Sequence, residues 1–122
     1  MNYLKPITPN QVDLLVVEDN LHVLNAVSRM FKKDFARVFG CTQTDQGLTI
    51  IETELAPHSV VLSDHHNPLS PYHGAHLALI SEPVRKTKNI PFYLMSGGLH
   101  SANASQERRA IQEMQNKRII HG

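Results

Sequence analysis

Short apolar runs that end in acidic or hydroxyl residues restrict the fold of this sequence more than any other feature. Such a run is typical of a strand that is buried on both faces, as in a parallel sheet. The runs, each with the polar residues at its end, are residues 13–17 before Glu18 and Asp19, residues 59–64 ending in Asp64, and residues 90–95 before Ser96. Open α/β sheets bind ligands at the carboxyl ends of their strands, so we expect Asp64 to lie in a ligand-binding crevice.

Segments with helical periodicity separate these runs. Apolar residues at every third or fourth position predict amphipathic helices, and proline or glycine indicates where a segment ends. The predicted helices are residues 20–33, 44–55 before Pro57, 74–82 before Pro83, and 105–117. Residues 84–89 are predicted to be a basic connection, and residues 36–39, closed by Gly40, and 118–120 to be two further short strands.

The order of these elements predicts the architecture. Strands that alternate with helices form a parallel sheet with helices on both of its faces. Residues 1–11, which contain Pro6 and Pro9, are predicted to be an irregular lead-in, and residues 12–122 to form one domain. A chain of 122 residues is long enough to bury a core, and it has little room for a second domain.

Composition and charge argue against several classes of function. A net charge of +1 with scattered basic residues gives no reason to expect binding to nucleic acid or to an anionic membrane. Cys41 is the only cysteine, so the chain can form neither an internal disulfide nor a thiolate metal cluster. No apolar run approaches the length of about 18 residues that a membrane span needs, and the amino terminus has no apolar signal core. We therefore expect a soluble, cytoplasmic protein.

The carboxylates at the strand ends predict a metal site. Glu18, Asp19 and Asp64 would meet at one edge of the sheet, and crowded carboxylates either have a raised pKa or bind a cation. Carboxylate oxygens, with a few water molecules, are the ligands that suit Mg²⁺. The bound cation would let a phosphoryl group approach Asp64 as the nucleophile, and the nearby Ser96 hydroxyl would bond the phosphoryl oxygens.

The same residues resemble the receiver domain of response regulators, the phosphoacceptor domain of two-component signalling. Residues 15–20 resemble the family's first strand and acidic pair. Residues 61–64, with Pro68 and Gly74, resemble the phosphoacceptor strand and its loop. Residues 90–97 resemble the fourth strand and its terminal hydroxyl residue. The resemblance extends over nearly the whole chain. It implies an α/β, flavodoxin-like (βα)5 sandwich of three layers with sheet order 2-1-3-4-5, whose last helix is missing because the sequence stops at Gly122.

The resemblance also implies a role for each site residue. Asp64 would accept a phosphoryl group from a histidine kinase, a phosphotransfer protein or a small phosphodonor. Glu18, Asp19, Asp64 and the backbone carbonyl of His66 would bind Mg²⁺, and Ser96 would bond a phosphoryl oxygen. The domain would not be an enzyme beyond catalysing its own phosphorylation and dephosphorylation, and it would act through a downstream protein partner or as a homodimer.

The lysine that completes the family's site has two candidates. Lys117 follows Ser96 at close to the family's spacing, but residues 113–116 are too polar for a buried strand. If residues 118–120 are the strand instead, His121 stands where the lysine is expected. Neither candidate is directly preceded by the aromatic residue of the family's usual switch, and the loop after Asp64 is slightly longer than is common.

These departures leave a second function open, in which a degenerate receiver acts as a protein interaction module that needs no phosphorylation. A small hydrolase is disfavoured, because His66, and not a second acid, stands two residues after Asp64. A further alternative is a transition-metal site, since His73 and His76 have a helix-compatible spacing for one ion. With eight histidines in the chain, however, some cluster by chance.

Overall fold

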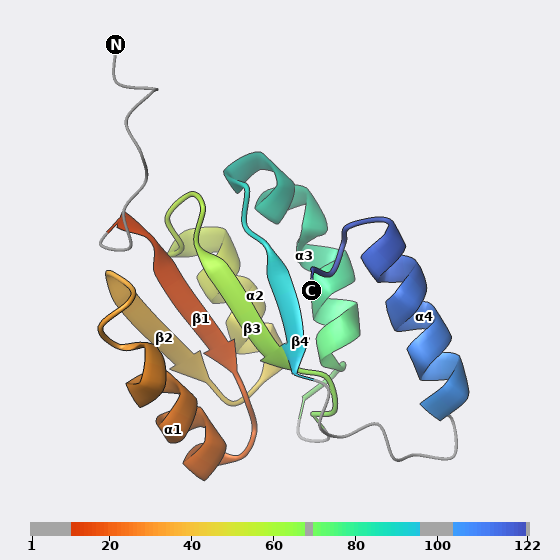
Figure 1. The fold of residues 1–122 in the computed structure, drawn as a ribbon, viewed down its shortest axis with the longest axis horizontal. Helices are drawn as coiled ribbons and strands as arrows, with labels where there is room; N and C mark the ends of the chain where they lie inside the picture. Colours follow the sequence, from red (N-terminus) through yellow and green to blue (C-terminus); the bar gives the residue numbers. More distant parts are fainter. Residues whose placement is uncertain (1–10, 68–69, 96–103, 122) are drawn as a thin grey trace.

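The computed structural model describes residues 11–67, 70–95 and 104–121. Parallel strands form a central sheet of order β2-β1-β3-β4, with helices on both faces (Figure 1). The elements are β1 (Asp13–Val17), α1 (Leu21–Phe31), β2 (Arg37–Cys41), α2 (Thr44–Thr53), β3 (Val60–Asp64), α3 (Gly74–Lys88), β4 (Phe92–Met95) and α4 (Ala104–Asn116). The predicted flavodoxin-like alternation and the order 2-1-3-4 are confirmed. The predicted lead-in falls almost entirely outside the described residues.

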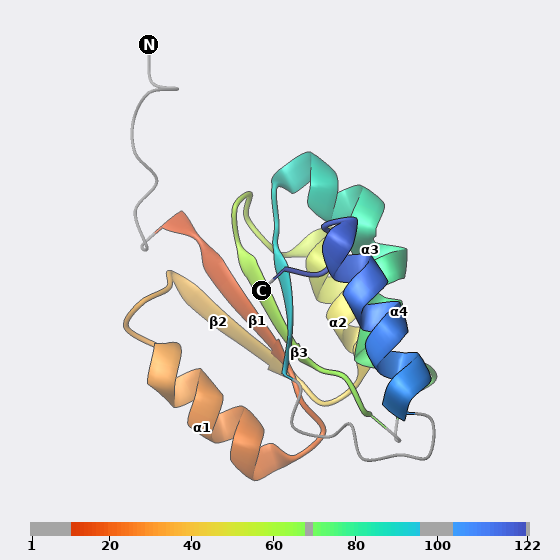
Figure 2. The ribbon, with the colours of Figure 1, turned by 45° about the vertical axis from the view of Figure 1, so that its right-hand side comes forward.

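The helices divide unequally between the two faces of the sheet. Figure 2 shows α2, α3 and α4 on one face and α1 on the other. The face below α2 and α3 carries the larger core, in which Leu15, Val61 and Phe92 are buried with Ile51 and Leu77 of the helices. This packing follows from the two-residue period of a strand, which turns alternate side chains to opposite faces.

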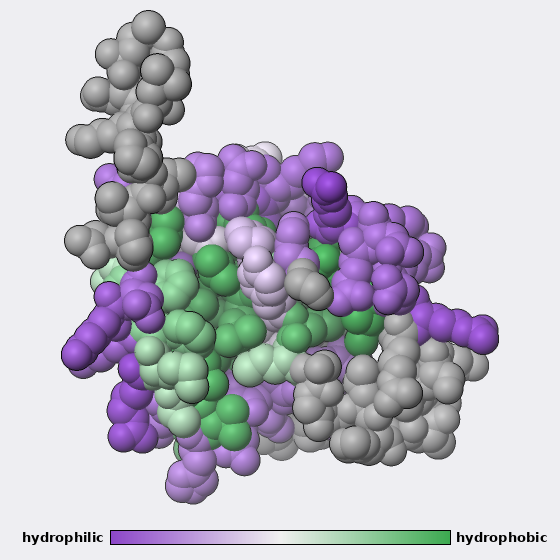
Figure 3. Space-filling model, in the orientation of Figure 1, coloured by the Kyte–Doolittle hydropathy of each residue, from purple (hydrophilic) through white to green (hydrophobic). Residues whose placement is uncertain are grey.

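The sheet face that α1 covers is also apolar over β3 and β4, where α1 does not cover it. Leu14 and Val16 of β1 are buried with Leu24 of α1, whereas Val60 and Leu62 of β3 are only partly buried. Val38 of β2 and Met95 of β4 are also only partly buried on this face, and the exposed fraction of Tyr93 is 37%. Apolar side chains gather over the middle of the sheet in this view (Figure 3). Among the described helices, α1 alone lies on this face, so β3 and β4 remain uncovered there.

The sequence predicts that Pro83 stops or kinks a helix and that residues 84–89 form a connection, but helix α3 does not stop there. The helix continues through Pro83 to Lys88 and ends at Asn89, whose φ of 55° is left-handed. Proline removes one helical hydrogen bond, but Ser81 and Arg85 on either side of it are buried. The Arg85 guanidinium also donates to the carbonyl of Ala78 at 2.6 Å and to Ser81 Oγ at 2.9 Å. Tertiary packing and this side chain hold the second half of the helix in place.

Two strand boundaries also differ from the prediction. Strand β2 continues through Gly40 to Cys41, which pair with Val16 and Val17 of β1. The missing Cβ of Gly40 leaves room for Leu24 of α1, because a Cβ there would lie 3.1 Å from Leu24 Cδ1. Strand β4 begins at Phe92 and not at residue 90. Pro91 has no N–H to donate to a neighbouring strand, which explains the later start.

The predicted strand over residues 118–120 is not formed. Arg118 has a left-handed φ of 58°, which no β-strand contains. The chain then pairs with β4 through a single parallel bridge, Tyr93 to His121, and Ile120 is buried in the larger core. The order β2-β1-β3-β4 is therefore extended at its β4 edge by one residue.

None of the helices in the described part of the chain is both long enough and apolar enough to cross a membrane.

Candidate functional site

The register of β1 and β3 brings the predicted acids together. Val17 pairs with Ser63, so the next residues along the two strands, Glu18 and Asp64, end up side by side. Both leave their strands at the carboxyl-terminal edge of the sheet, where a parallel arrangement gathers the strand ends. Asp19 follows Glu18 in the connection to α1, whose N-cap is Asn20. Because Asn20 caps α1 through its own side chain, Asp19 is not needed for that role.

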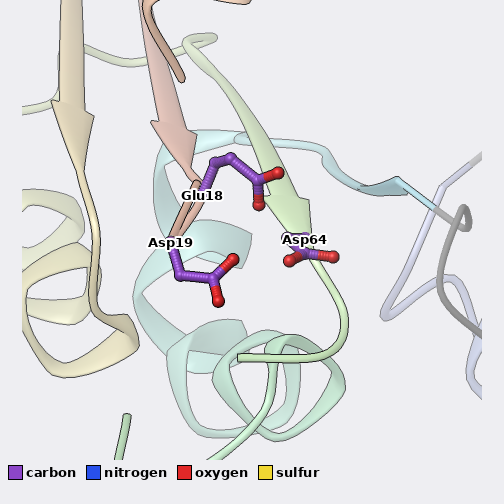
Figure 4. Close-up of side chains that lie close together, drawn as sticks. All are labelled: Glu18, Asp19 and Asp64. Atoms are coloured by element: carbon purple, nitrogen blue, oxygen red, sulfur yellow. The ribbon is translucent and has the colours of Figure 1, made fainter. Parts of the chain in front are cut away.

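The three carboxylates lie close enough to share one ion. One oxygen from each of Glu18, Asp19 and Asp64 lies within 4.8 Å of the others. Figure 4 shows the side chains directed into the same space, Glu18 and Asp19 from the end of β1 and Asp64 from the end of β3. Glu18 is buried, and the other two are half-buried. The predicted convergence of these acids is thus present in the structure.

Burial and the neighbouring charges raise the pKa values of Glu18 and Asp64. Burial raises the pKa of Glu18 to about 8, with further contributions from its hydrogen bond and charge repulsion with Asp64 and from the charge of Asp19. Burial also raises the pKa of Asp64, and the charge of Asp19 adds to this, while the hydrogen bond with Glu18 and the backbone N–H of His66 oppose it. Without a cation, Glu18 holds a proton that it shares with Asp64 near neutral pH.

The donor set fits a hard divalent cation. Glu18 Oε2 is buried and, among the described residues, has no hydrogen-bond partner. A buried carboxylate oxygen without a partner is costly, and a cation would remove that cost while replacing the shared proton. Oxygen ligands only, from three carboxylates, match the preference of Mg²⁺. These residues therefore fit the metal that the sequence predicted.

The other predicted site residues are Ser96, His66 and Lys117. Ser96 lies outside the described residues. His66 stands in the loop after Asp64, with an exposed imidazole and a backbone carbonyl two residues from the acid. Lys117 is not brought to the carboxylates: it follows the last turn of α4, and its Nζ forms an ion pair with Glu113 at 3.3 Å.

The position of Lys117 is at the opposite end of the sheet. It lines a surface hollow of about 540 Å³ together with Ile90 and Pro91, which precede β4. Asp64, in contrast, pairs with Met95 at the end of β4. His121 does not reach the acids either, since it pairs with Tyr93, two residues before Met95. Neither candidate for the family's lysine occupies that position, because α4 ends at the amino-terminal edge of the sheet.

The histidines after Asp64 do not form the alternative metal site. The rings of His66 and His73 are stacked, with centroids 4.9 Å apart, and the His76 ring lies against Tyr72 at 5.2 Å. Within the described part of the chain, the carboxylate trio is the one group of three or more potential ligands whose donor atoms converge. The described rings of His73 and His76 thus contact different partners and are not directed at one shared ion.

Sequence reasoning missed the contacts that hold the loop after Asp64. Asn67 is fully buried, and its Nδ2 donates to the carbonyl of Thr42 at 2.8 Å. The Asn67 N–H donates to His73 Nδ1 at 3.2 Å. Ser70 Oγ accepts the N–H of Thr44 at 2.9 Å, which ties the loop to the start of α2. No pattern in the sequence indicates these bonds, since they join segments that the loop conformation alone brings together.

The comparisons with solved structures agree with this geometry. The signal receiver domain of an HD domain-containing protein from Pseudomonas fluorescens Pf-5 matches 98% of this chain and 77% of its own, with a TM-score of 0.67 and 14% identity. The receiver domain of a two-component response regulator from Bacteroides fragilis matches 83% of this chain and 76% of its own, with a TM-score of 0.61 and 25% identity. The chain has the receiver-domain fold.

A further solved structure has a similar fold. An adenylate cyclase structure from Rhodopirellula baltica has a TM-score of 0.72 with 20% identity, over 93% of this chain and 73% of that one. No model of a protein family matches the sequence, and no curated protein is similar to it. The resemblance to response-regulator receivers is thus confirmed through the fold.

Proposed function

We propose that this receiver domain accepts a phosphoryl group on Asp64 in two-component signalling. The observation that carries the proposal is the convergence of Glu18, Asp19 and Asp64 at one edge of the sheet, with a buried Glu18 oxygen lacking a partner in the described structure. Crowded acids of this kind are unfavourable unless a cation is bound or a proton is shared. Mg²⁺, when bound, would neutralise the acids and the incoming phosphoryl oxygens.

The chemistry assigned to Asp64 is a displacement at phosphorus. A carboxylate oxygen of Asp64 forms a bond to the phosphorus while the bond from phosphorus to the donor breaks. With a phosphohistidine donor whose other ring nitrogen carries a proton, the phosphorylated nitrogen leaves with the electron pair of that bond, and the donor histidine becomes a neutral imidazole. Glu18 and Asp19 hold the cation, and the His66 N–H, which bonds the Asp64 carboxylate, orients the nucleophile. The products are an aspartyl phosphate and a free histidine.

Several roles follow from this proposal. The donor would be a histidine kinase, a phosphotransfer protein or a small phosphodonor such as acetyl phosphate. The protein would act on itself and not as an enzyme on other substrates. Its output would pass to a protein partner or to a second copy of the chain.

The experiment is an intact mass measurement after incubation with acetyl phosphate and Mg²⁺. We expect one added phosphate on the wild type and none on Asp64→Asn. Asp45→Asn, at an exposed carboxylate in the first turn of α2, is the matched control and should gain the phosphate. An adduct that persists in Asp64→Asn would assign the modification to another residue.

A specific observation also supports a second candidate, a receiver that acts as an interaction module without phosphorylation. Lys117, which was expected to complete the site, lies at the other end of the sheet beside Pro91. This candidate predicts no adduct on the wild type with acetyl phosphate. Beryllofluoride with Mg²⁺ gives an independent result, because it should then leave the NMR signals of Asp64 and its neighbours unchanged.

A further inference from the structure

The peptide unit between His66 and Asn67 is held by a side chain from the start of α3. The N–H of this unit, which belongs to Asn67, donates to His73 Nδ1 at 3.2 Å. The carbonyl of the same unit belongs to His66. A peptide unit is planar, and no cis peptide bond occurs in the described residues, so the N–H and the carbonyl point in opposite directions. A contact that fixes the Asn67 N–H therefore fixes the direction of the His66 carbonyl.

We propose that His73 is a positioning residue that directs the His66 carbonyl toward the cation site formed by Glu18, Asp19 and Asp64. The inference rests on the proposed function and on the role of Mg²⁺ ligand that the resemblance to receiver domains implies for this carbonyl. A hydrogen bond donated by the N–H also polarises the carbonyl of the same peptide unit. His73 would thus set both the direction and the donor strength of that ligand.

The imidazole of His73 is available for this task and is held in place by its neighbours. His73 is the N-cap of α3, but its side chain makes no capping bond. Its ring stacks on His66 with an angle of 21° between the ring planes, and the His65 ring lies 5.7 Å away. An Nδ1 that accepts a hydrogen bond carries no proton, so the ring proton is on Nε2. The ring therefore contacts the loop by one hydrogen bond and by its faces.

Further bonds prevent the loop from turning as a whole. The Asn67 side chain is anchored to Thr42 across the edge of the sheet, at 2.8 Å. The carbonyl of His65 accepts the N–H of Gly74, the first residue of α3, at 2.8 Å. With both ends of the segment held, the bond to His73 opposes rotation of the peptide unit between His66 and Asn67.

The test uses four single variants of the whole chain. His73→Ala removes the ring, and His73→Phe keeps a ring for stacking but removes the acceptor. His73→Gln offers a side-chain oxygen that can accept the Asn67 N–H. His76→Ala is the matched control, because it removes a histidine from the same helix whose ring contact is with Tyr72.

Two quantities are measured on each variant: the dissociation constant for Mg²⁺, and the hydrogen-exchange rate of the Asn67 amide. We expect His73→Ala and His73→Phe to bind Mg²⁺ about tenfold more weakly, the usual size of an effect from a residue that orients a ligand. The Asn67 amide should exchange faster in both. His73→Gln should recover part of the affinity, and His76→Ala should match the wild type in both measurements.

The outcomes separate this inference from the proposed function. If the wild type binds Mg²⁺ and His73→Phe binds it equally well, the positioning role is wrong and the proposed function stands. Equal weakening by His76→Ala would also overturn it, since the effect would then come from the stability of α3. If the wild type does not bind Mg²⁺, the metal site itself is wrong, and both proposals are overturned.

Discussion

Gly74 lies against the backbone of Asp64. A Cβ atom added to Gly74 would come within 2.9 Å of Ser63 Oγ and 3.0 Å of the Asp64 carbonyl carbon, and it would overlap the Asp64 carbonyl oxygen. Real Cβ atoms do not make such contacts with backbone. Helix α3 therefore begins in direct contact with the strand end that carries the proposed phosphoacceptor, and a residue without a side chain is required there.

We expect Gly74→Ala to displace the end of β3. The backbone of Asp64 cannot yield as a side chain would, so the free energy of unfolding should fall by about 2 kcal/mol, a typical cost of overpacking. Mg²⁺ affinity should fall as well, because Asp64 moves. Gly40→Ala is the control: its Cβ would meet the side chain of Leu24, which can adjust. Urea unfolding and Mg²⁺ titration of both variants check this, and equal effects would contradict it.

The stability of the metal-free protein should decrease as pH rises from about 5 to about 8. The pKa of Glu18 is raised to about 8 in the folded state, from an ordinary value of 4.5 in the unfolded chain. A group whose pKa is raised by folding stabilises the fold while it is protonated, and this contribution is lost as pH rises through the folded pKa. Thermal unfolding at a series of pH values without divalent cations measures the effect.

Magnesium should reverse that loss. Because the cation replaces the proton shared by Glu18 and Asp64, the increase in Tm on adding Mg²⁺ should be larger at pH 8 than at pH 5.5. In Glu18→Gln the pH dependence of Tm over this range should become smaller, because the carboxyl group with the raised pKa is absent. A Tm increase that is the same at both pH values would mean that the cation does not compete with protons at this site.

Asp13→Asn should destabilise the fold without affecting the metal site. The buried Asp13 carboxylate accepts bonds from Arg37 at 2.9 and 3.0 Å and from the Ala56 N–H at 3.0 Å. We expect a loss of about 2 kcal/mol in the free energy of unfolding. Asp13 begins β1 and Glu18 follows its end, so Mg²⁺ affinity should stay unchanged. Weaker Mg²⁺ binding by this variant would show that the two ends of the sheet are coupled.

Arg85→Met should loosen the carboxyl-terminal segment. Burial lowers the pKa of Arg85 to about 10, so it remains charged at neutral pH. Its guanidinium donates to the carbonyls of Ile90 and Ile119 at 3.1 and 3.0 Å. We expect about 3 kcal/mol of lost stability, because buried acceptors lose a charged donor, and faster amide exchange at residues 119–121. The exposed Lys86→Met is the control, and faster exchange in both variants would contradict the assignment.

The sheet and its acidic edge could be predicted because they depend on local patterns. A short apolar run specifies a buried strand, and the parallel arrangement then brings Glu18 and Asp64 together without further information. The course of the chain after Pro83 could not be predicted in this way. The helix persists there because Arg85 is buried and bonded within the fold, which is a tertiary effect.

The position of Lys117 and the hydrogen bond of His73 could not be predicted from the sequence for a different reason. The spacing between Ser96 and Lys117 gives only their separation along the chain. Helix α4 lies between them and ends at the amino-terminal edge of the sheet, so Lys117 is far from the carboxylates. The bond of His73 to Asn67 depends on the conformation of the loop between β3 and α3, for which the sequence has no periodic signal. Side-chain contacts within irregular loops are the part of this site that only coordinates reveal.

The ion pair of Asp13 with Arg37 and the acids around Asp64 lie at opposite edges of the sheet, and β1 connects the two. Substituting Asp13 should lower the stability of the fold and leave the metal site unchanged, whereas substituting the acids changes what the chain can bind. A set of variants divided in this way would separate effects on folding stability from effects on Mg²⁺ binding, each measured by its own assay.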